Sequence, residues 1–223
     1  MLRHRSRYRR RGRSQGLRRP QRSRAHSRKR ALSLRSLQLR RRDGFGTEEV
    51  TTLHTARLIL RPVADDDRDA LHAIFTQPGV RRFIFDDQLI SRELTDDIVR
   101  KSLTLFAGKR FGLWLAWTPA GALVGFGAFW YFRDPPELEL LYGVADEHVG
   151  AGFGREIAQA ITDYGFTALE MTTIHASTDS AHARSRRLLE TLGFEFERRA
   201  IIDGLDTVFY TATRDSIARH EPE

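Results

Sequence analysis

The sequence predicts a mixed α+β domain with a mostly antiparallel sheet, and three observations support this class. Short apolar runs bounded by turn residues, typical of strands, are interspersed with segments of 3.6-residue apolar period, typical of helices. Three consecutive strand candidates lie between residues 111 and 144 with only turns between them, as in antiparallel hairpins. A glycine-rich loop then joins a strand to a helix. The predicted order of elements is β-α-α-β-β-β-α-β-α-β-β.

The first predicted elements are a strand and a helix. The pattern of Arg57–Arg61 predicts a short strand that Pro62 ends. The three aspartates at 65–67 offer N-cap oxygens and favourable first-turn charge to the helix that follows. We prefer this capping interpretation of the aspartates to metal binding. The pair at 78–79, proline and glycine, is expected to end the helix.

The central part of the chain predicts one more helix and then the three strands. The helix is expected over residues 92–106, with Gly108 closing it. The strands are expected over 111–117, 122–132 and 138–144, the first two joined by a proline- and glycine-containing turn.

The last part of the chain alternates helices and strands and ends in a hairpin. Gly193 is a suitable C′ residue for the second of its helices. An Asp-Gly pair at 203–204 marks the hairpin turn. The expected elements are a helix over 155–168, a strand over 171–177, a helix from 180 to 193, and strands over 195–201 and 207–212.

The basic charge of the chain lies in its N-terminal segment. Of the 37 Lys and Arg residues, 18 lie within residues 1–43 beside one acidic residue, which gives that segment a net charge of +17. The rest of the chain holds 19 basic and 28 acidic residues, a net charge of −9. So polar a segment cannot bury enough surface to offset its ordering entropy. We therefore expect a disordered tail and linker over 1–46, a folded domain over 47–217, and a short C-terminal tail over 218–223.

Four interpretations of residues 1–42 stay open. Accessible arginines bind phosphates, so the segment predicts weak contact with RNA or DNA. Arginine- and serine-rich segments with few acids are also typical of mitochondrial or chloroplast presequences. A third interpretation is translated leader sequence ahead of a start further downstream. We favour the fourth, disorder without an essential function.

Composition argues against several classes of protein. The chain has no cysteine, which excludes disulfide frameworks and thiolate metal sites. Its eight histidines show no ligand spacing, so no metal is expected. No apolar run is long enough to span a membrane, and no apolar stretch follows the charged N-terminus as it would in a secretory signal. We expect a cytoplasmic protein.

The sharpest local signal is the glycine loop, Gly-Ala-Gly-Phe-Gly-Arg-Glu over residues 150–156. Glycines let backbone N–H groups turn toward a ligand, and the following helix N-terminus adds unpaired donors and partial positive charge. Together they predict a pyrophosphate site. The spacing is neither the Gly-x-Gly-x-x-Gly of dinucleotide-binding folds nor a P-loop. Without further evidence, the default interpretation of the glycine loop is an ordinary turn.

Three segments resemble the GNAT superfamily of N-acetyltransferases. Residues 139–156 (ELLYGVADEHVGAGFGRE) resemble its acetyl-CoA-binding segment, an acidic strand that leads into Arg-Gly-x-Gly-Tyr-Ala-x-Glu. Residues 182–194 (HARSRRLLETLGF) resemble its Asn-x-x-Ser-x-x-x-Leu-Glu-x-Leu-Gly-Phe segment. Residues 55–62 (TARLILRP) look like its opening strand, in the branch that includes ribosomal-protein alanine N-acetyltransferases. The three blocks occur in the family's order.

The resemblance implies a fold, a cosubstrate and a binding site. The fold is a mostly antiparallel, partly mixed central sheet flanked by about four helices. The cosubstrate is acetyl-CoA, and no metal is implied. The residues that match the family's coenzyme-binding positions are Val144, Ala145, Gly150, Ala151, Gly152, Phe153, Gly154, Arg155, His182 and Ser185.

The chain departs from the family pattern where side chains contact coenzyme phosphates. Val149 and Ala151 stand where the family has basic residues, so only backbone N–H groups and Arg155 remain there. His182 replaces the family's asparagine, and Leu141 replaces a glycine beside the thioester. We expect weaker coenzyme binding than is usual in the family.

The resemblance also suggests catalytic residues. The tyrosine that many members use as an acid maps to Leu189, whereas the serine proposed in the ribosomal-protein branch maps to Ser185. The proposed base maps to Glu139, and backbone N–H groups near Tyr142 would polarise the carbonyl. Glu139, Tyr142 and Ser185 are therefore the catalytic candidates. In the alternative interpretations without a catalytic role, Glu139 faces solvent between two leucines, and Ser185 only caps a helix or makes a local hydrogen bond.

The expected activity is transfer of an acetyl group from acetyl-CoA to a primary amine of a protein N-terminus or a small molecule. The alternatives are a non-catalytic acyl-CoA-binding protein and nucleic-acid binding through the Arg-rich tail. By analogy with the fold, the acceptor is expected to contact residues 83–90, 130–134 and 203–206. The acceptor's identity does not follow from the sequence.

Overall fold

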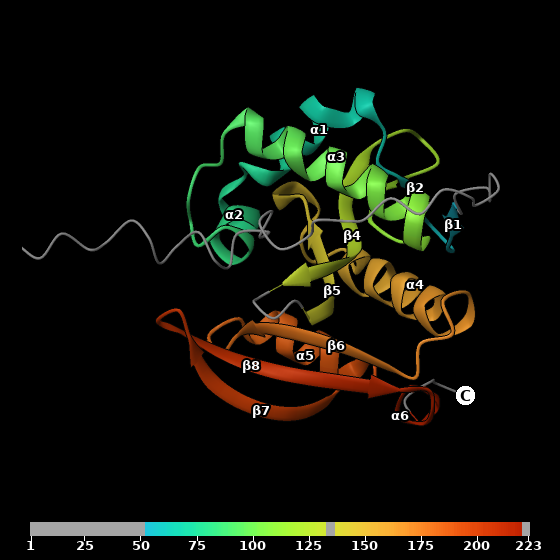
Figure 1. The fold of residues 1–223 in the computed structure, drawn as a ribbon, viewed down its shortest axis with the longest axis vertical. Coiled ribbons are helices and arrows are strands. Elements are labelled where there is room, and N and C mark those ends of the chain that lie inside the picture. The colour runs from blue at the N-terminus through green and yellow to red at the C-terminus, as the bar shows by residue number, and fades with distance from the viewer. Residues whose placement is uncertain (1–51, 133–136, 220–223) are drawn as a thin grey trace, which may run out of the picture.

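The computed structural model describes residues 52–132 and 137–219. The expected disordered tail, its linker, residues 133–134 of the acceptor region and the prolines at 135–136 lie outside the described residues. Figure 1 shows the described chain as a central sheet with helices packed against it.

One eight-stranded sheet runs through the molecule in the order β1-β2-β3-β4-β5-β6-β8-β7. All neighbouring strands are antiparallel except β5 and β6, which are parallel. This confirms the predicted mostly antiparallel, partly mixed sheet. The strands are β1 (Leu53–His54), β2 (Ile59–Pro62), β3 (Leu113–Trp117), β4 (Leu123–Phe132), β5 (Glu137–Val144), β6 (Thr173–Asp179), β7 (Glu195–Ile202) and β8 (Leu205–Thr213).

Six α-helices occur in the described part of the chain, two more than the sequence predicts. The short helices α2 and α6 and the two-residue strand β1 were not expected. Proline at N1 is compatible with a helix start, so Pro78 begins α2 as well as lying beyond the end of α1. The helices are α1 (Arg68–Phe75), α2 (Pro78–Ile84), α3 (Arg92–Lys109), α4 (Phe153–Thr167), α5 (Ala183–Thr191) and α6 (Arg214–Ala218).

Two local predictions about helix ends are wrong. The aspartates 65–67 form a 3-10 turn, and none of their side chains caps α1. The Asp67 carboxylate instead accepts from the Ala64 N–H at 2.8 Å and from both terminal nitrogens of Arg61 at 2.7 Å. Gly108 lies inside α3, which ends at the left-handed Arg110, whose carbonyl accepts from the Tyr164 hydroxyl. Gly193 does adopt the left-handed conformation expected after α5.

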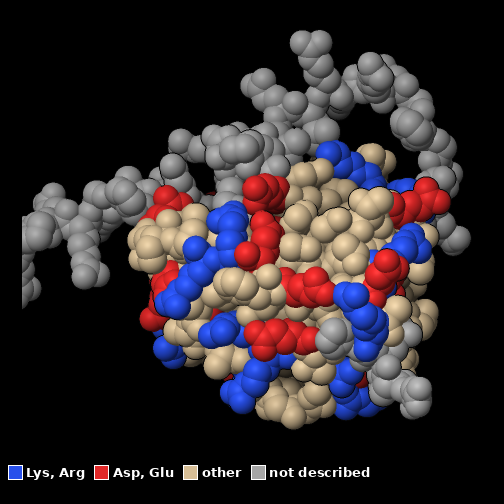
Figure 2. All heavy atoms as spheres, turned by 90° about the horizontal axis from the view of Figure 1, so that it is seen from below, with Lys and Arg blue, Asp and Glu red and all other residues tan. Residues whose placement is uncertain are grey.

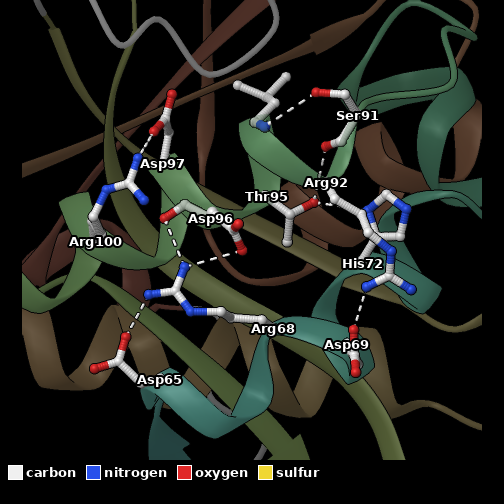
Figure 3. Close-up of polar contacts among 11 residues, drawn as sticks. Asp65, Arg68, Asp69, His72, Ser91, Arg92, Thr95, Asp96, Asp97 and Arg100 are labelled. Carbon is white, nitrogen blue, oxygen red and sulfur yellow. Dashed lines mark hydrogen bonds and ion pairs between the residues drawn. The ribbon is translucent and has the colours of Figure 1, made fainter.

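Charged side chains connect α1 to α3 (Figure 3). Arg68 lies between Asp65 and Asp96, 3.0 Å from the latter, and Arg92 pairs with Asp69. These ion pairs are largely exposed, so each adds little stability. The helices are held mainly by their buried apolar faces, which include Leu71 and Ile98.

The helix α4 lies close against β4 because that strand carries glycines where they face. A β-carbon at Gly127 would come within 2.8 Å of Ile157 and 2.9 Å of Ile161. The core is rich in aromatic side chains, and Trp114 and Trp130 are fully buried. This packing fixes the N-terminus of α4 beside the end of β5.

The face formed by β7 and its neighbours carries both signs of charge. Seen from below in Figure 2, blue and red side chains intermingle there. Ion pairs join Glu195 to Arg219 and Arg199 to Asp206. Because β7 is an edge strand, such charges discourage pairing with a strand of another chain. No helix in the described part of the chain is long and apolar enough to cross a bilayer.

Candidate functional site

The site lies where β5 and β6 diverge. These parallel strands share a single registered pair, Glu139 with His175. Toward the C-terminal end of β5, the opening forms a cleft of about 460 Å³. Its walls come from the end of β5, the glycine loop, α2 and α5; they are Gly79, Val80, Phe83, Ile84, Tyr142, Gly143, Val144, Asp146, His148, Val149, Gly150, Gly152, Gly154, Arg155, His182, Arg184, Ser185 and Leu188.

The glycine loop presents free backbone donors to this cleft. Gly150 and Gly152 have positive φ angles of 96° and 84°, conformations that glycine adopts without strain. Within the described chain, no acceptor pairs with the amide N–H groups of Gly152, Phe153, Gly154 or Arg155. Unpaired donors at the start of a 15-residue helix suit a negatively charged ligand.

The end of β5 presents further donors to the opening. The Ala145 N–H donates to the Val124 carbonyl of β4 at 2.9 Å. Because N–H directions alternate along a strand, those of Tyr142 and Val144 point away from β4, toward the cleft. These are the backbone groups near Tyr142 for which the sequence predicts a carbonyl-polarising role.

Most of the residues expected to bind coenzyme line the cleft. Those that do are Val144, Gly150, Gly152, Gly154, Arg155, His182 and Ser185. Three others support it from behind: Ala145 is buried and bonded to β4, the Ala151 carbonyl accepts from Arg57, and the Phe153 ring packs under the Arg57 guanidinium.

The cleft contains two arginines despite the uncharged Val149 and Ala151. Arg155 follows the loop, as expected, and Arg184 projects from the first turn of α5. Both are exposed. Sequence reasoning did not select Arg184, although its place two residues after His182 was a usable signal. These cations add to the positive potential of the α4 N-terminus.

The opposite wall is α2, which the sequence did not predict. The Asp146 carboxylate accepts from the Gly79 N–H at 3.0 Å, and the Asp146 N–H donates to Gln77 at 2.8 Å. This pair of bonds ties the start of α2 to the segment that follows β5. It also places Phe83 over the cleft.

Phe83 and His182 form a stacked pair across the cleft. Their ring centroids are 3.6 Å apart and their planes differ by 2°. Burial, together with the nearby charges of Arg184 and Arg82, lowers the pKa of His182 from 6.5 to about 4. The imidazole is therefore neutral near pH 7, and its Nδ1 lies 3.4 Å from the Thr178 hydroxyl.

Tyr142 and Ser185 meet at the inner end of the cleft. Their hydroxyl oxygens are 2.8 Å apart, and either hydroxyl can be the donor. Burial raises the pKa of Tyr142 to about 12, so its hydroxyl keeps its proton at neutral pH. The Ser185 hydroxyl is thus bonded to another catalytic candidate, 43 residues away in the chain, and not to a neighbouring backbone group.

Beyond these hydroxyls lies a smaller pocket of about 90 Å³. The Glu139 carboxylate lines it and is only 2% exposed, so the solvent-facing interpretation of this residue is wrong. The Ser177 hydroxyl donates to Glu139 at 2.5 Å. Ser177 was not selected from the sequence, because the contact depends on how β5 pairs with β6.

The two cavities are continuous. They share Phe83, Ile84, Tyr142, His182 and Ser185. The smaller one also receives Phe132 and Asp203, so each of the three segments expected to contact the acceptor contributes to it. Within residues 52–132 and 137–219, no three His, Asp or Glu side chains are grouped to hold a metal ion.

Comparisons with known proteins identify the family to which the chain is similar. A sequence model of the acetyltransferase (GNAT) domain matches residues 57–195. The uncharacterized N-acetyltransferase YoaA of Bacillus subtilis is 30% identical over 65% of this chain and 83% of its own length. The spermidine N(1)-acetyltransferase of Vibrio cholerae is 24% identical over 62% of this chain and 79% of its own length.

Solved structures share the fold. A GNAT-family acetyltransferase from Bordetella pertussis superposes with a TM-score of 0.64 at 20% identity, covering 73% of this chain and 99% of its own. RimL, a ribosomal L7/L12 alpha-N-protein acetyltransferase in complex with coenzyme A, gives 0.64 at 15% identity, covering 74% and 99%. At these identities the likeness concerns the fold alone.

Proposed function

The chain belongs to the acetyltransferase (GNAT) family, an acetyl-CoA-dependent family of N-acetyltransferases, and on that premise we propose that it acetylates a primary amine of a polypeptide N-terminus or a small molecule. The observation that supports this best is the pair of continuous cavities that meet at Tyr142 and Ser185. One has the donors of a coenzyme site, and the other contains a buried carboxylate.

The larger cleft fits coenzyme A chemically. The unpaired N–H groups at the start of α4, with Arg155 and Arg184, suit the pyrophosphate and phosphate groups. The outward N–H groups of Tyr142 and Val144 suit the amides of the pantetheine arm and the thioester oxygen. Acetyl-CoA, when bound, supplies the activated acetyl group.

Glu139 is proposed as the base. An amine must lose a proton to become a nucleophile, and the Glu139 carboxylate lines the pocket through which the amine would arrive. The Ser177 hydroxyl donates to one carboxylate oxygen and so restricts the orientation of the Glu139 side chain. The proton passes from the amine nitrogen to Glu139 directly or through one water.

The Tyr142–Ser185 pair is proposed as the acid. When the new C–N bond has formed and the C–S bond breaks, the sulfur leaves as a thiolate that needs a proton. A tyrosine with a pKa of about 12 is protonated at neutral pH and can supply that proton. The hydrogen bond to Ser185 fixes the orientation of its hydroxyl.

The small volume of the inner pocket limits the acceptor. About 90 Å³ accommodates the reacting amine and a small substituent, whereas larger groups would lie outside. The pocket contains the Glu139 carboxylate, and Asp203 lies at the turn between β7 and β8, so a cationic amine is favoured over an anionic one.

Thiol release tests this proposal directly. The chain has no cysteine, so a thiol reagent reports only coenzyme A. The full-length chain is incubated with acetyl-CoA and peptides with free N-terminal Ala or Ser, a polyamine, or an aminoglycoside, with the N-acetylated peptides as blanks. We expect thiol release, and acetylated product by mass spectrometry, with at least one free amine.

A matched pair of variants tests the base. Glu139→Gln should lower kcat by about 10²-fold or more. Glu137→Gln alters an exposed carboxylate two residues earlier on the same face of β5 and should leave kcat unchanged. Equal rates in the two variants would rule out Glu139 as the base, and coenzyme binding without transfer to any amine would favour the acyl-CoA-binding alternative.

A further inference from the structure

Arg57 lies between β1 and β2 but contacts the glycine loop nearly a hundred residues later. Its Nε donates to the Glu156 carboxylate at 2.8 Å, and its Nη1 donates to the Ala151 carbonyl at 3.0 Å. Its guanidinium lies 4.6 Å from the centroid of the Phe153 ring. One side chain therefore holds the loop, the first helical turn and the ring between them.

Glu156 is the partner that orients Arg57. Its Oε1 accepts from the Thr55 hydroxyl at 2.5 Å and from the Arg57 N–H at 2.8 Å, while Oε2 lies 2.7 Å from Nη2. Burial raises the pKa of Glu156, but the bonds from Thr55 and Arg57 outweigh it and leave the pKa below its usual value. The carboxylate therefore stays ionised and keeps the guanidinium in one orientation.

The bond to Ala151 has a consequence for the cleft. In a trans peptide the carbonyl oxygen and the following N–H point in opposite directions. When Arg57 holds the Ala151 carbonyl on the outer side of the loop, the Gly152 N–H turns to the other side, where Gly152 lines the cleft. The guanidinium also lies close beneath Gly152, because a β-carbon there would be 3.3 Å from Nη2.

We propose that Arg57 is a positioning residue for the coenzyme site, which holds the loop of residues 150–154 in its anion-binding conformation from outside the cleft. The proposal rests on coenzyme binding in the cleft. The proposal explains how the loop can bind phosphates although Val149 and Ala151 are uncharged. Because Arg57 orders the loop before binding, less conformational entropy is lost when the phosphates bind. Arg57 itself does not line the cleft.

Arg61, on the strand that follows Arg57, provides a matched control. Arg61 binds Asp67 through two bonds of 2.7 Å and stacks on Trp117, away from the cleft. Its side chain is 40% exposed and that of Arg57 is 50% exposed. Loss of either arginine should lower stability, but only loss of Arg57 should alter the loop.

The test compares Arg57→Met, Arg57→Lys and Arg61→Met in the full-length chain. In Arg57→Met, coenzyme A should bind about tenfold more weakly by calorimetry, while kcat at saturating acetyl-CoA stays unchanged. Lysine keeps the charge, but one ammonium cannot bind Glu156, bind Ala151 and stack on Phe153 together. Arg57→Lys should therefore also bind more weakly, and Arg61→Met should bind as the unaltered chain does.

Hydrogen exchange without coenzyme provides an independent measurement. The hydrogen-bonded amides at the two ends of the loop, Ala151 N–H (to His148) and Glu156 N–H (to Gly152), should exchange faster in Arg57→Met but not in Arg61→Met. Unaltered loop exchange in Arg57→Met, or full affinity in Arg57→Lys, would overturn the positioning role. Failure of the unaltered chain to bind coenzyme A would refute the proposed function, and the exchange measurement would still decide the role of Arg57.

Discussion

Gly152 offers a quantitative test of the loop geometry. Its φ of 84° at the N-cap of α4 is a left-handed conformation, in which a β-carbon costs roughly 1–2 kcal/mol. In Gly152→Ala the exposed loop relieves this strain by adopting another backbone conformation. Coenzyme binding must then restore the left-handed conformation, and the cost of doing so lowers the affinity. At 1.4 kcal/mol per decade, coenzyme A should then bind roughly 5- to 30-fold more weakly. Calorimetric titration of the full-length chain measures this.

Gly121→Ala is the control for that variant. Gly121 has a φ of 86° in the β3–β4 turn, and a β-carbon there would meet no atom within 4 Å. The backbone strain is the same, so both variants should lose thermal stability, but only Gly152→Ala should lose affinity. Equal affinity in the two variants would refute the reasoning that the left-handed Gly152 shapes the coenzyme site.

Three more predictions concern packing, protonation and catalysis. Gly127→Ala places a methyl group 2.8 Å from Ile157 and should lower the free energy of unfolding by about 1–3 kcal/mol in urea titrations. Gly108→Ala, with open space around it in α3, should not lower it. Equal free energies of unfolding in the two variants would contradict the close α4–β4 contact. Because the pKa of His182 is lowered in the folded chain, the unfolded chain binds more protons between pH 6.5 and about 4, and stability falls as the pH drops through this window. His182→Asn should flatten that part of a stability–pH curve. An unchanged slope would contradict the lowered pKa of His182. Tyr142→Phe should lower kcat by about 10²-fold with little change in the KM for acetyl-CoA, and a variant as fast as the unaltered enzyme would exclude Tyr142 as the acid.

Local signals predicted most of the fold. Short apolar runs bounded by turn residues predicted the strands from β3 to β5 and the closing hairpin, and helical period or terminal residues predicted α1, α3, α4 and α5. The failures have physical causes. Pro78 is compatible with a helix start as well as a stop, so α2 was missed, and Arg110 rather than Gly108 takes the left-handed position because Tyr164 holds its carbonyl.

The candidate site was predictable where it is local in sequence. The glycine loop and its helix lie within one short segment, and their geometry follows from glycine and helix termini. The contacts between distant segments were not predictable: Ser177 contacts Glu139 because β6 pairs with β5, and Phe83 contacts His182 because of an unexpected helix. Arg57 was noted as part of a motif, but its contacts with Ala151 and Glu156 depend on how the segment before β2 lies beside the start of α4.

Calorimetric titration of acetyl-CoA into the full-length chain tests the central claim most directly. We predict saturable one-site binding in the micromolar range. Gly152→Glu should strongly reduce this binding, because its carboxylate would repel the coenzyme phosphates. Absence of binding at millimolar acetyl-CoA, with the chain folded by circular dichroism, would contradict the assignment of the β5–β6 opening as a coenzyme site.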